Sequence, residues 1–144
     1  MDEEVLGVTY FVAGLLDSLE CRYALGGSLA TTAHGHIRNT NDADIIAELQ
    51  LQHADEFVEV LGDDFYSDAH TIREAIAQRR SFNIIHLSTM FKVDIFVASH
   101  LPFDQLQLGR RIQLPIIEGA PLIYVTTVED SILAKLNWFR KGGE

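Results

Sequence analysis

The sequence predicts an α/β fold of the α+β kind, a mixed β-sheet flanked by helices. Two observations carry this prediction. Between residues 3 and 19, apolar side chains recur at steps of three and four, as in an amphipathic helix packed on a core. Further along, short apolar runs of strand length alternate irregularly with helical patterns, and two of them form a hairpin. This order differs from regular βαβ alternation and so favours a mixed sheet.

Each further element has a local signal. A short apolar strand is expected at residues 21–25 and ends at Gly26-Gly27, after which Ser28 can begin a helix through about residue 33. Gly62 is a natural stop for a helix over 52–61. Ser88-Thr89 would turn a hairpin. The remaining expectations are strands at 42–48, 81–87 and 91–98, a loop or short strand at 63–67, helices at 68–79 and 100–108, and weaker strands at 110–117 and 122–125.

The last helix is expected to begin with a capping box, Thr126-x-x-Glu129. Its apolar stripe would contain Val128, Ile132, Leu136 and Phe139, and Lys135 falls within this stripe. A lysine that faces a core costs free energy unless its ammonium meets an anion or reaches solvent. We therefore expect either a phosphate contact or a stripe-edge lysine in water.

Composition limits the class of protein. The 144 residues fit one domain, 1–144, which is large enough for a real core. The formal net charge of -10 opposes attraction to nucleic acid or to an anionic membrane. A single cysteine, Cys21, excludes an intrachain disulfide. The acidic start and the lack of an apolar run of ~18 residues predict a cytoplasmic protein with no membrane association.

Two aspartates at strand spacing are the first candidate site residues. Side chains on a strand alternate, so Asp42 and Asp44 point the same way, roughly 7 Å apart. Like charges on one face repel, and a divalent cation would accept both carboxylates. Oxygen ligands are what Mg²⁺ prefers. The alternative is a solvated strand edge with no ligand.

Glycines and a third carboxylate extend this candidate site. At Gly26-Gly27-Ser28, backbone amides can approach a phosphate, although such a triplet also serves as an ordinary turn. Asp94 lies inside an apolar strand, where a lone acid needs a partner. If that strand lies beside the Asp42–Asp44 strand, the three carboxylates suit two-metal phosphoryl or nucleotidyl transfer. Asp94 would then help to take a proton.

Arg38 and Thr40 precede the aspartates in steps of two, and Arg38 could pair with a carboxylate or a phosphate. The histidines show no zinc-ligand spacing, and His34 and His36 are expected to be loop residues. The doublets Arg79-Arg80 and Arg110-Arg111 are interpreted as solvated edges, with an acceptor-binding surface as the alternative.

Together these motifs resemble the polymerase-beta-type nucleotidyltransferase superfamily. The resemblance covers about residues 20–140 and rests on Leu25-Gly26-Gly27-Ser28, Arg38-x-Thr40-x-Asp42-x-Asp44 and Lys92-Val93-Asp94. The pattern is most similar to bacterial nucleotidyltransferases related to abortive-infection and type IV toxin–antitoxin proteins. That similarity rests on His34-Gly35-His36 and on a closing segment at residues 128–139.

The resemblance implies a nucleotidyltransferase-like fold and a Mg²⁺-dependent transfer of a nucleoside monophosphate from a triphosphate, with pyrophosphate leaving. Two Mg²⁺ ions are implied, with Mn²⁺ as an alternative. The metal ligands and catalytic residues would be Asp42, Asp44 and Asp94. The nucleotide-binding residues would be Gly26, Gly27, Ser28, Arg38, Thr40 and Lys135. The acceptor is left open among RNA, protein and small molecules.

Two alternatives to an active enzyme follow. A non-catalytic member, antitoxin-like or a regulatory subunit, would bind nucleotide or a protein partner on the same fold, and a protein partner or homo-oligomer is expected if the acceptor site is shared. A hydrolase that uses Ser28 is disfavoured, because no His/Asp arrangement around it can be named and the G-x-S-x-G elbow is absent.

Overall fold

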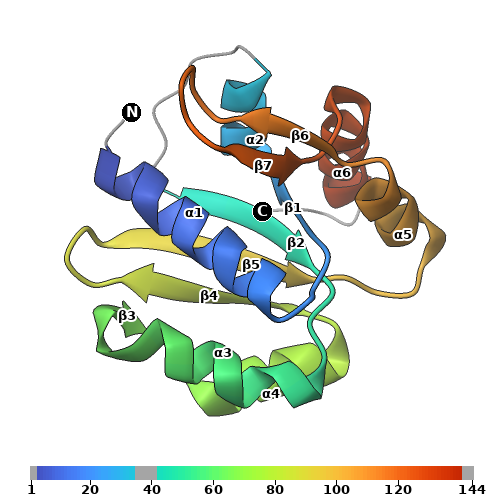
Figure 1. Ribbon diagram of the computed structural model, residues 1–144. Coiled ribbons are helices and arrows are strands. Elements are labelled where there is room, and N and C mark those ends of the chain that lie inside the picture. Colours follow the sequence, from blue (N-terminus) through green and yellow to red (C-terminus); the bar gives the residue numbers. More distant parts are fainter. Residues whose placement is uncertain (1–2, 35–41, 141–144) are drawn as a thin grey trace.

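Figure 1 shows the computed structural model of the chain, which describes residues 3–34 and 42–140, and only the backbone at positions 28, 31, 138 and 139. The helices are α1 (Glu3–Ser18), α2 (Gly27–Ala33), α3 (Ala54–Leu61), α4 (Ala69–Gln78), α5 (Pro102–Gly109) and α6 (Val128–Arg140). The strands are β1 (Tyr23–Gly26), β2 (Asp42–Ala47), β3 (Phe65–Tyr66), β4 (Ser81–His86), β5 (Phe91–Val97), β6 (Ile112–Pro115) and β7 (Leu122–Val125). Short 3-10 turns at Leu51–His53 and Gly62–Asp64 flank α3.

The strands form one mixed seven-stranded sheet in the order β3-β4-β5-β2-β1-β7-β6, which confirms the predicted fold class. β2 pairs with β5 and β1 with β7 in parallel, whereas the other neighbours are antiparallel. The β4–β5 hairpin was predicted by its flanking β-rich runs. β2 lies between β1 and β5. The glycine turn at the end of β1, the aspartates of β2 and Asp94 of β5 therefore lie next to one another in the middle of the sheet.

The two faces of the sheet differ in their cover. Figure 1 shows α1 crossing in front of β2 and β5, with α3 and α4 beside β4. This face carries alternate buried residues of each strand, such as Ile45 on β2 and Ile95 on β5. On the opposite face the alternate residues of β2 and β5 are half-buried or exposed. The predicted alternation along β2 is therefore confirmed, and it leaves one face open for function.

Helix α1 packs through the stripe that its spacing predicts. Val8, Val12 and Leu15 are buried against the sheet, and Leu16 is fully buried. No helix among the described residues combines the length and the apolar character needed to cross a membrane.

Two interior glycines of α1 lead to a first prediction. A Cβ added at Gly7 or Gly14 meets no atom within 4 Å. Glycine in a helix interior costs about 0.5–1 kcal/mol relative to alanine. We expect Gly7→Ala and Gly14→Ala each to raise the free energy of unfolding by about that amount in urea titrations. Lower stability of either variant would contradict this account of α1.

Helix α6 corrects two predictions. Thr127 caps it, accepting a hydrogen bond from the Asp130 amide at 3.1 Å, whereas the predicted cap was Thr126. Its apolar stripe does not face a core either, because Val128, Ile132 and Leu136 are each more than 40% exposed. The covered side is built instead on Asp130, whose buried carboxylate accepts two hydrogen bonds from Arg110, at 3.1 and 2.8 Å. The two residues of this ion pair are 20 positions apart in the sequence, and their contact turns the Asp130 side of the helix towards the rest of the protein.

Arg79, Arg80 and Arg110 are exposed, as the solvated-edge interpretation of the two doublets expects, but three of the four arginines also make contacts that the sequence did not indicate. Arg110 forms that ion pair with Asp130, and Arg111 donates to the Tyr23 carbonyl while its guanidinium lies 3.7 Å from the centre of the Tyr124 ring. Arg79 caps α4 in a left-handed conformation and donates to the Ala98 carbonyl at 3.1 Å. These three arginines therefore tie elements together.

Candidate functional site

The candidate carboxylates lie on the open face of the sheet, on its two central parallel strands. In the β2–β5 register, Asp44 is directly opposite Asp94, and Asp42 is opposite Lys92. Neighbouring strands are ~4.8 Å apart, so the side chains of an opposed pair lie in contact range. Asp42, Asp44 and Asp94 are all half-buried. The structure thus brings together the carboxylates of two motifs separated by 50 residues.

A glycine of the predicted turn lies directly against one of these carboxylates. β1 runs antiparallel to β2 and places Gly26 opposite Asp44. The next residue, Gly27, has a positive φ of 59° and begins α2. A Cβ built on Gly27 would be 2.3 Å from Asp44 Oδ2. Glycine is therefore required at this position for two reasons: the backbone has a positive φ, and Asp44 occupies the space that a Cβ would need.

The electrostatics of the site centre on Asp44. Burial, followed by the nearby charges of Asp42 and Asp94, raises the pKa of its carboxyl from 3.8 to about 6. Lys92 opposes these effects, and a hydrogen bond between Asp44 and Asp94 favours the protonated form. Lys92 Nζ also lies 3.6 Å from Asp94 Oδ2. The site therefore holds more negative charge than its own basic groups neutralise.

The donor set fits a divalent cation. Within residues 3–34 and 42–140, no three His, Cys, Asp or Glu side chains already form a cluster that could hold a metal ion. Two carboxylates are nevertheless in hydrogen-bond contact, and a third lies two residues away on the same face. An oxygen-binding cation would be attracted to these carboxylates and would remove their mutual repulsion. Asp44 and Asp94, with Asp42, are the residues that would hold it.

The other predicted site residues fall into three groups. Gly26 and Gly27 are in place beside Asp44, and Ser28 follows in α2 with only its backbone described. Arg38 and Thr40 lie outside the described residues. Lys135 is exposed on α6, a helix that packs against α2. Its predicted phosphate contact remains a prediction.

Two residues of the open face were not given a role from the sequence. Lys92 forms the ion pair with Asp94, and Phe96 lies 44% exposed two residues beyond Asp94 on the same face. Their spacing of two residues on either side of Asp94 could have indicated this position, because alternate residues of a strand share a face. An exposed phenyl ring on a central strand leaves an apolar surface next to the carboxylates.

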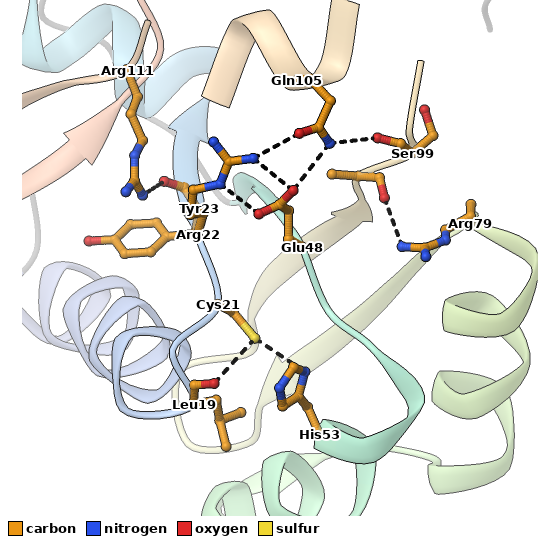
Figure 2. Close-up of polar contacts among 11 residues, drawn as sticks. Leu19, Cys21, Arg22, Tyr23, Glu48, His53, Arg79, Ser99, Gln105 and Arg111 are labelled. Carbon is orange, nitrogen blue, oxygen red and sulfur yellow. Dashed lines mark hydrogen bonds and ion pairs between the residues drawn. The ribbon is translucent and has the colours of Figure 1, made fainter. Parts of the chain in front are cut away.

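A polar network fixes the end of the sheet beyond these residues (Figure 2). Arg22 donates to Glu48 through Nε and Nη2, at 2.6 and 2.8 Å, and Nη2 also donates to Gln105 Oε1 at 2.8 Å. Gln105 Nε2 in turn donates to Glu48 at 3.1 Å and to the Ser99 carbonyl at 2.9 Å. The Arg22 hydrogen bond holds the pKa of Glu48 below its usual range. The network holds α5 on the sheet, where Leu108 packs on Ala24.

Two further side chains have structural contacts. His34, expected in a loop, ends α2 and lies with Nε2 3.0 Å from the Thr126 carbonyl oxygen. Cys21 is buried, and its Sγ lies 3.4 Å from His53 Nδ1 (Figure 2). Burial, followed by the charge of Glu48, raises the pKa of the Cys21 thiol to about 11, which keeps it protonated and unreactive.

The fold is of the nucleotidyltransferase type. Among solved structures, the chain resembles a candidate nucleotidyltransferase (TM1012) from Thermotoga maritima, with a TM-score of 0.62 and 15% identity, over 99% of this chain and 89% of that one. It also resembles the lincomycin-bound lincosamide antibiotic adenylyltransferase LnuA, with a TM-score of 0.53 and 15% identity, over 92% of this chain and 85% of that one. No protein-family model and no curated protein matches the sequence.

Proposed function

We propose that this protein is a nucleotidyltransferase that moves a nucleoside monophosphate from a triphosphate to an acceptor hydroxyl. The observation that carries the proposal is the register of β2 and β5. It opposes Asp44 to Asp94, beside Gly27 and on the open face of a sheet of the nucleotidyltransferase type. Mg²⁺ is the proposed cation, with two ions bound, and Mn²⁺ is a substitute.

Each residue has a role in this proposal. Gly26 and Gly27 present no side chain that would keep a phosphate from the backbone, and Ser28 would hold the triphosphate. The bound metal would orient the triphosphate and lower the pKa of the attacking hydroxyl. Asp94 would take the hydroxyl proton while the new oxygen–phosphorus bond forms and the bond to pyrophosphate breaks. Lys92, whose Nζ lies 3.6 Å from Asp94 Oδ2, would help to hold Asp94 in place.

A transfer assay tests the proposal. The protein is incubated with Mg²⁺ and each α-³²P-labelled nucleoside triphosphate, with RNA, protein lysate and small hydroxyl compounds as acceptors. The likeness to LnuA, which is named for a lincosamide substrate class, favours small hydroxyl compounds, lincomycin among them, as the first to try. We expect label transfer that is lost in Asp42→Asn/Asp44→Asn. Metal-dependent nucleotide binding without transfer would support the non-catalytic, antitoxin-like or regulatory module. If no metal-dependent binding occurs, both functions are wrong.

Lys135 provides a separate test of the nucleotide-binding role of α6. Its side chain is exposed, so Lys135→Ala should change the free energy of unfolding by no more than about 0.5 kcal/mol. If the ammonium reaches the triphosphate, the variant should bind it several-fold more weakly in calorimetric titrations. Arg140→Ala, which removes the same charge from the end of α6, is the matched control. Equal affinities of the two variants would exclude a phosphate contact by Lys135.

Phe96 is expected to contact the acceptor. In the strand register it lies between Ile46 and Ser81, one step along the open face from Asp94. Phe96→Ala should raise the acceptor KM about fivefold or more in the transfer assay, because a desolvated ring contact of this size contributes about 1 kcal/mol or more. Triphosphate affinity should not change. Tyr66→Ala, at an exposed ring on the edge strand β3, should leave both unchanged. Identical acceptor KM values for the Phe96 variant and wild type would contradict this placement.

The finer assignments remain proposals. Kinship with the abortive-infection and toxin–antitoxin group rests on the motifs quoted above. A cytoplasmic location and a protein partner or homo-oligomer are expectations from composition and from the same resemblance.

A further inference from the structure

Helix α6 packs on the rest of the protein through small and polar side chains. Asp130 is buried, and Ser131 and Ala134 on the same side are half-buried. Asp130 is held by Arg110, and Ser131 Oγ lies 2.6 Å from Thr126 Oγ1. Figure 1 shows the helix at the periphery of the molecule, next to α5. One side of α6 is thus fixed on the protein, and the other side is turned to solvent.

The outward side of α6 is apolar in its middle. Ile132, Leu133 and Leu136 are 56%, 47% and 54% exposed. Glu129 precedes them and Arg140 follows them on the same helix. These five residues form an outward stripe, because they occupy positions i, i+3, i+4, i+7 and i+11. Apolar side chains that are half in water gain free energy when another apolar surface covers them.

Opposite charges stand at the two ends of the outward stripe. Glu129 and Arg140 are both exposed, and neither takes part in a salt bridge within residues 3–34 and 42–140. They are 11 positions apart, which corresponds to about 16 Å along the helix axis.

This distribution of charge makes the outward stripe complementary to an antiparallel copy of itself. When the centre of the contact lies midway between Leu133 and Leu136, each Glu129 faces the Arg140 of the other copy. A parallel pair would instead bring like charges together at both ends. The apolar residues meet in the middle of the contact in either case. The charges therefore favour one direction of pairing.

We propose that the outward stripe of α6 is a self-association surface, at which two copies of this chain pair their α6 helices antiparallel about a two-fold axis. The same residues contribute from both copies, so the contact closes at a dimer and does not extend into a filament. One helix face is smaller than the surface that permanent dimers bury, so the dimer is weak and reversible. This inference does not depend on the proposed nucleotidyl transfer.

Sedimentation velocity of the full chain, at protein concentrations from about 5 to 500 µM, measures the association. We expect a monomer–dimer equilibrium. Ile132→Asn/Leu136→Asn should raise the dissociation constant of the dimer about tenfold or more, because it removes most of the apolar contact. Val60→Asn, at a side chain of α3 that is 46% exposed, is the matched control and should leave the dissociation constant unchanged. Urea titrations check that each variant is folded.

Two results of this experiment would overturn the proposal. A wild-type chain that stays monomeric at every concentration would mean that the outward stripe is not covered by a second copy. A dimer of the Ile132→Asn/Leu136→Asn variant that is as tight as that of wild type would place the contact elsewhere on the molecule.

Charge reversals test the antiparallel direction. Glu129→Arg and Arg140→Glu should each weaken the dimer about threefold or more, since each places like charges at both ends of the contact. Both reversals in one chain restore opposite charges across the axis, so the dissociation constant should return to within about twofold of wild type. Glu59→Arg, at an exposed position of α3, controls for the change in net charge. If the double reversal associates no better than the single ones, the antiparallel pairing is wrong.

Discussion

Gly27→Ala is expected to abolish nucleotidyl transfer while the protein remains folded. A methyl group at this position would lie 2.3 Å from Asp44 Oδ2 and 3.2 Å from its Cγ, so the carboxylate must rotate away. That movement separates Asp44 from Asp94, its hydrogen-bond partner across the β2–β5 pair. Since catalytic groups must be held closely in place, we expect activity to fall by 100-fold or more. The measurement is the transfer assay together with thermal unfolding.

Gly119→Ala separates backbone strain from loss of the carboxylate position. Gly119 also has a positive φ, 85°, but a Cβ there meets no atom within 4 Å. Both variants should lose about 1–2 kcal/mol of stability, the cost of a left-handed conformation for an L-residue. Only Gly27→Ala should lose nucleotidyl transfer. Full activity of Gly27→Ala would show that the position of Asp44 is not required, and the proposed site would then be wrong.

The sequence predicts which side chains of a strand share a face of the sheet. It does not predict which strands lie next to each other. The alternation of Asp42, Asp44 and Ile46 with small and apolar residues is a local property, and it placed the carboxylates on one face of β2. That Asp94 lies opposite Asp44 depends on which strands pair and in which register. From the sequence we could say only that the three carboxylates would meet if the two strands were neighbours. Parallel pairing joins segments that lie far apart in the chain, so no local pattern indicates it.

The prediction of which face of α6 is packed was wrong for a related reason. Its apolar stripe was read as the packed face, because most amphipathic helices bury such a stripe. The structure buries Asp130 instead, since Arg110 arrives from the end of α5 and pairs with it. In the sequence, an acid in the first turn of a helix is expected to face solvent and to interact with the helix dipole, so Asp130 does not stand out. Its long-range partner is visible only once the fold brings the two segments together.

Asp44→Asn is expected to raise stability at pH 8 while it removes activity. The pKa of Asp44 is about 6 in the folded protein against 3.8 in a model peptide, so folding favours the protonated carboxyl. This stabilisation is fully present below the unfolded pKa and is lost as the pH rises through about 6. A shift of this size corresponds to about 3 kcal/mol, which we reduce to about 1–2 kcal/mol because the group is partly solvated. Asparagine has the same shape and no charge to penalise.

Urea titrations between pH 4 and pH 8 measure this effect. The stability gain of Asp44→Asn should grow as the pH rises from about 4 to about 6, the interval between the unfolded and folded pKa values, and should be complete above it. The exposed Asp63→Asn, on the turn before β3, should show no such dependence. Addition of Mg²⁺ should stabilise wild type at pH 8 and not the Asp44 variant, because the cation needs the ionised carboxylate. If Asp44→Asn were instead less stable at pH 8, the like-charge repulsion that motivates the metal site would be absent.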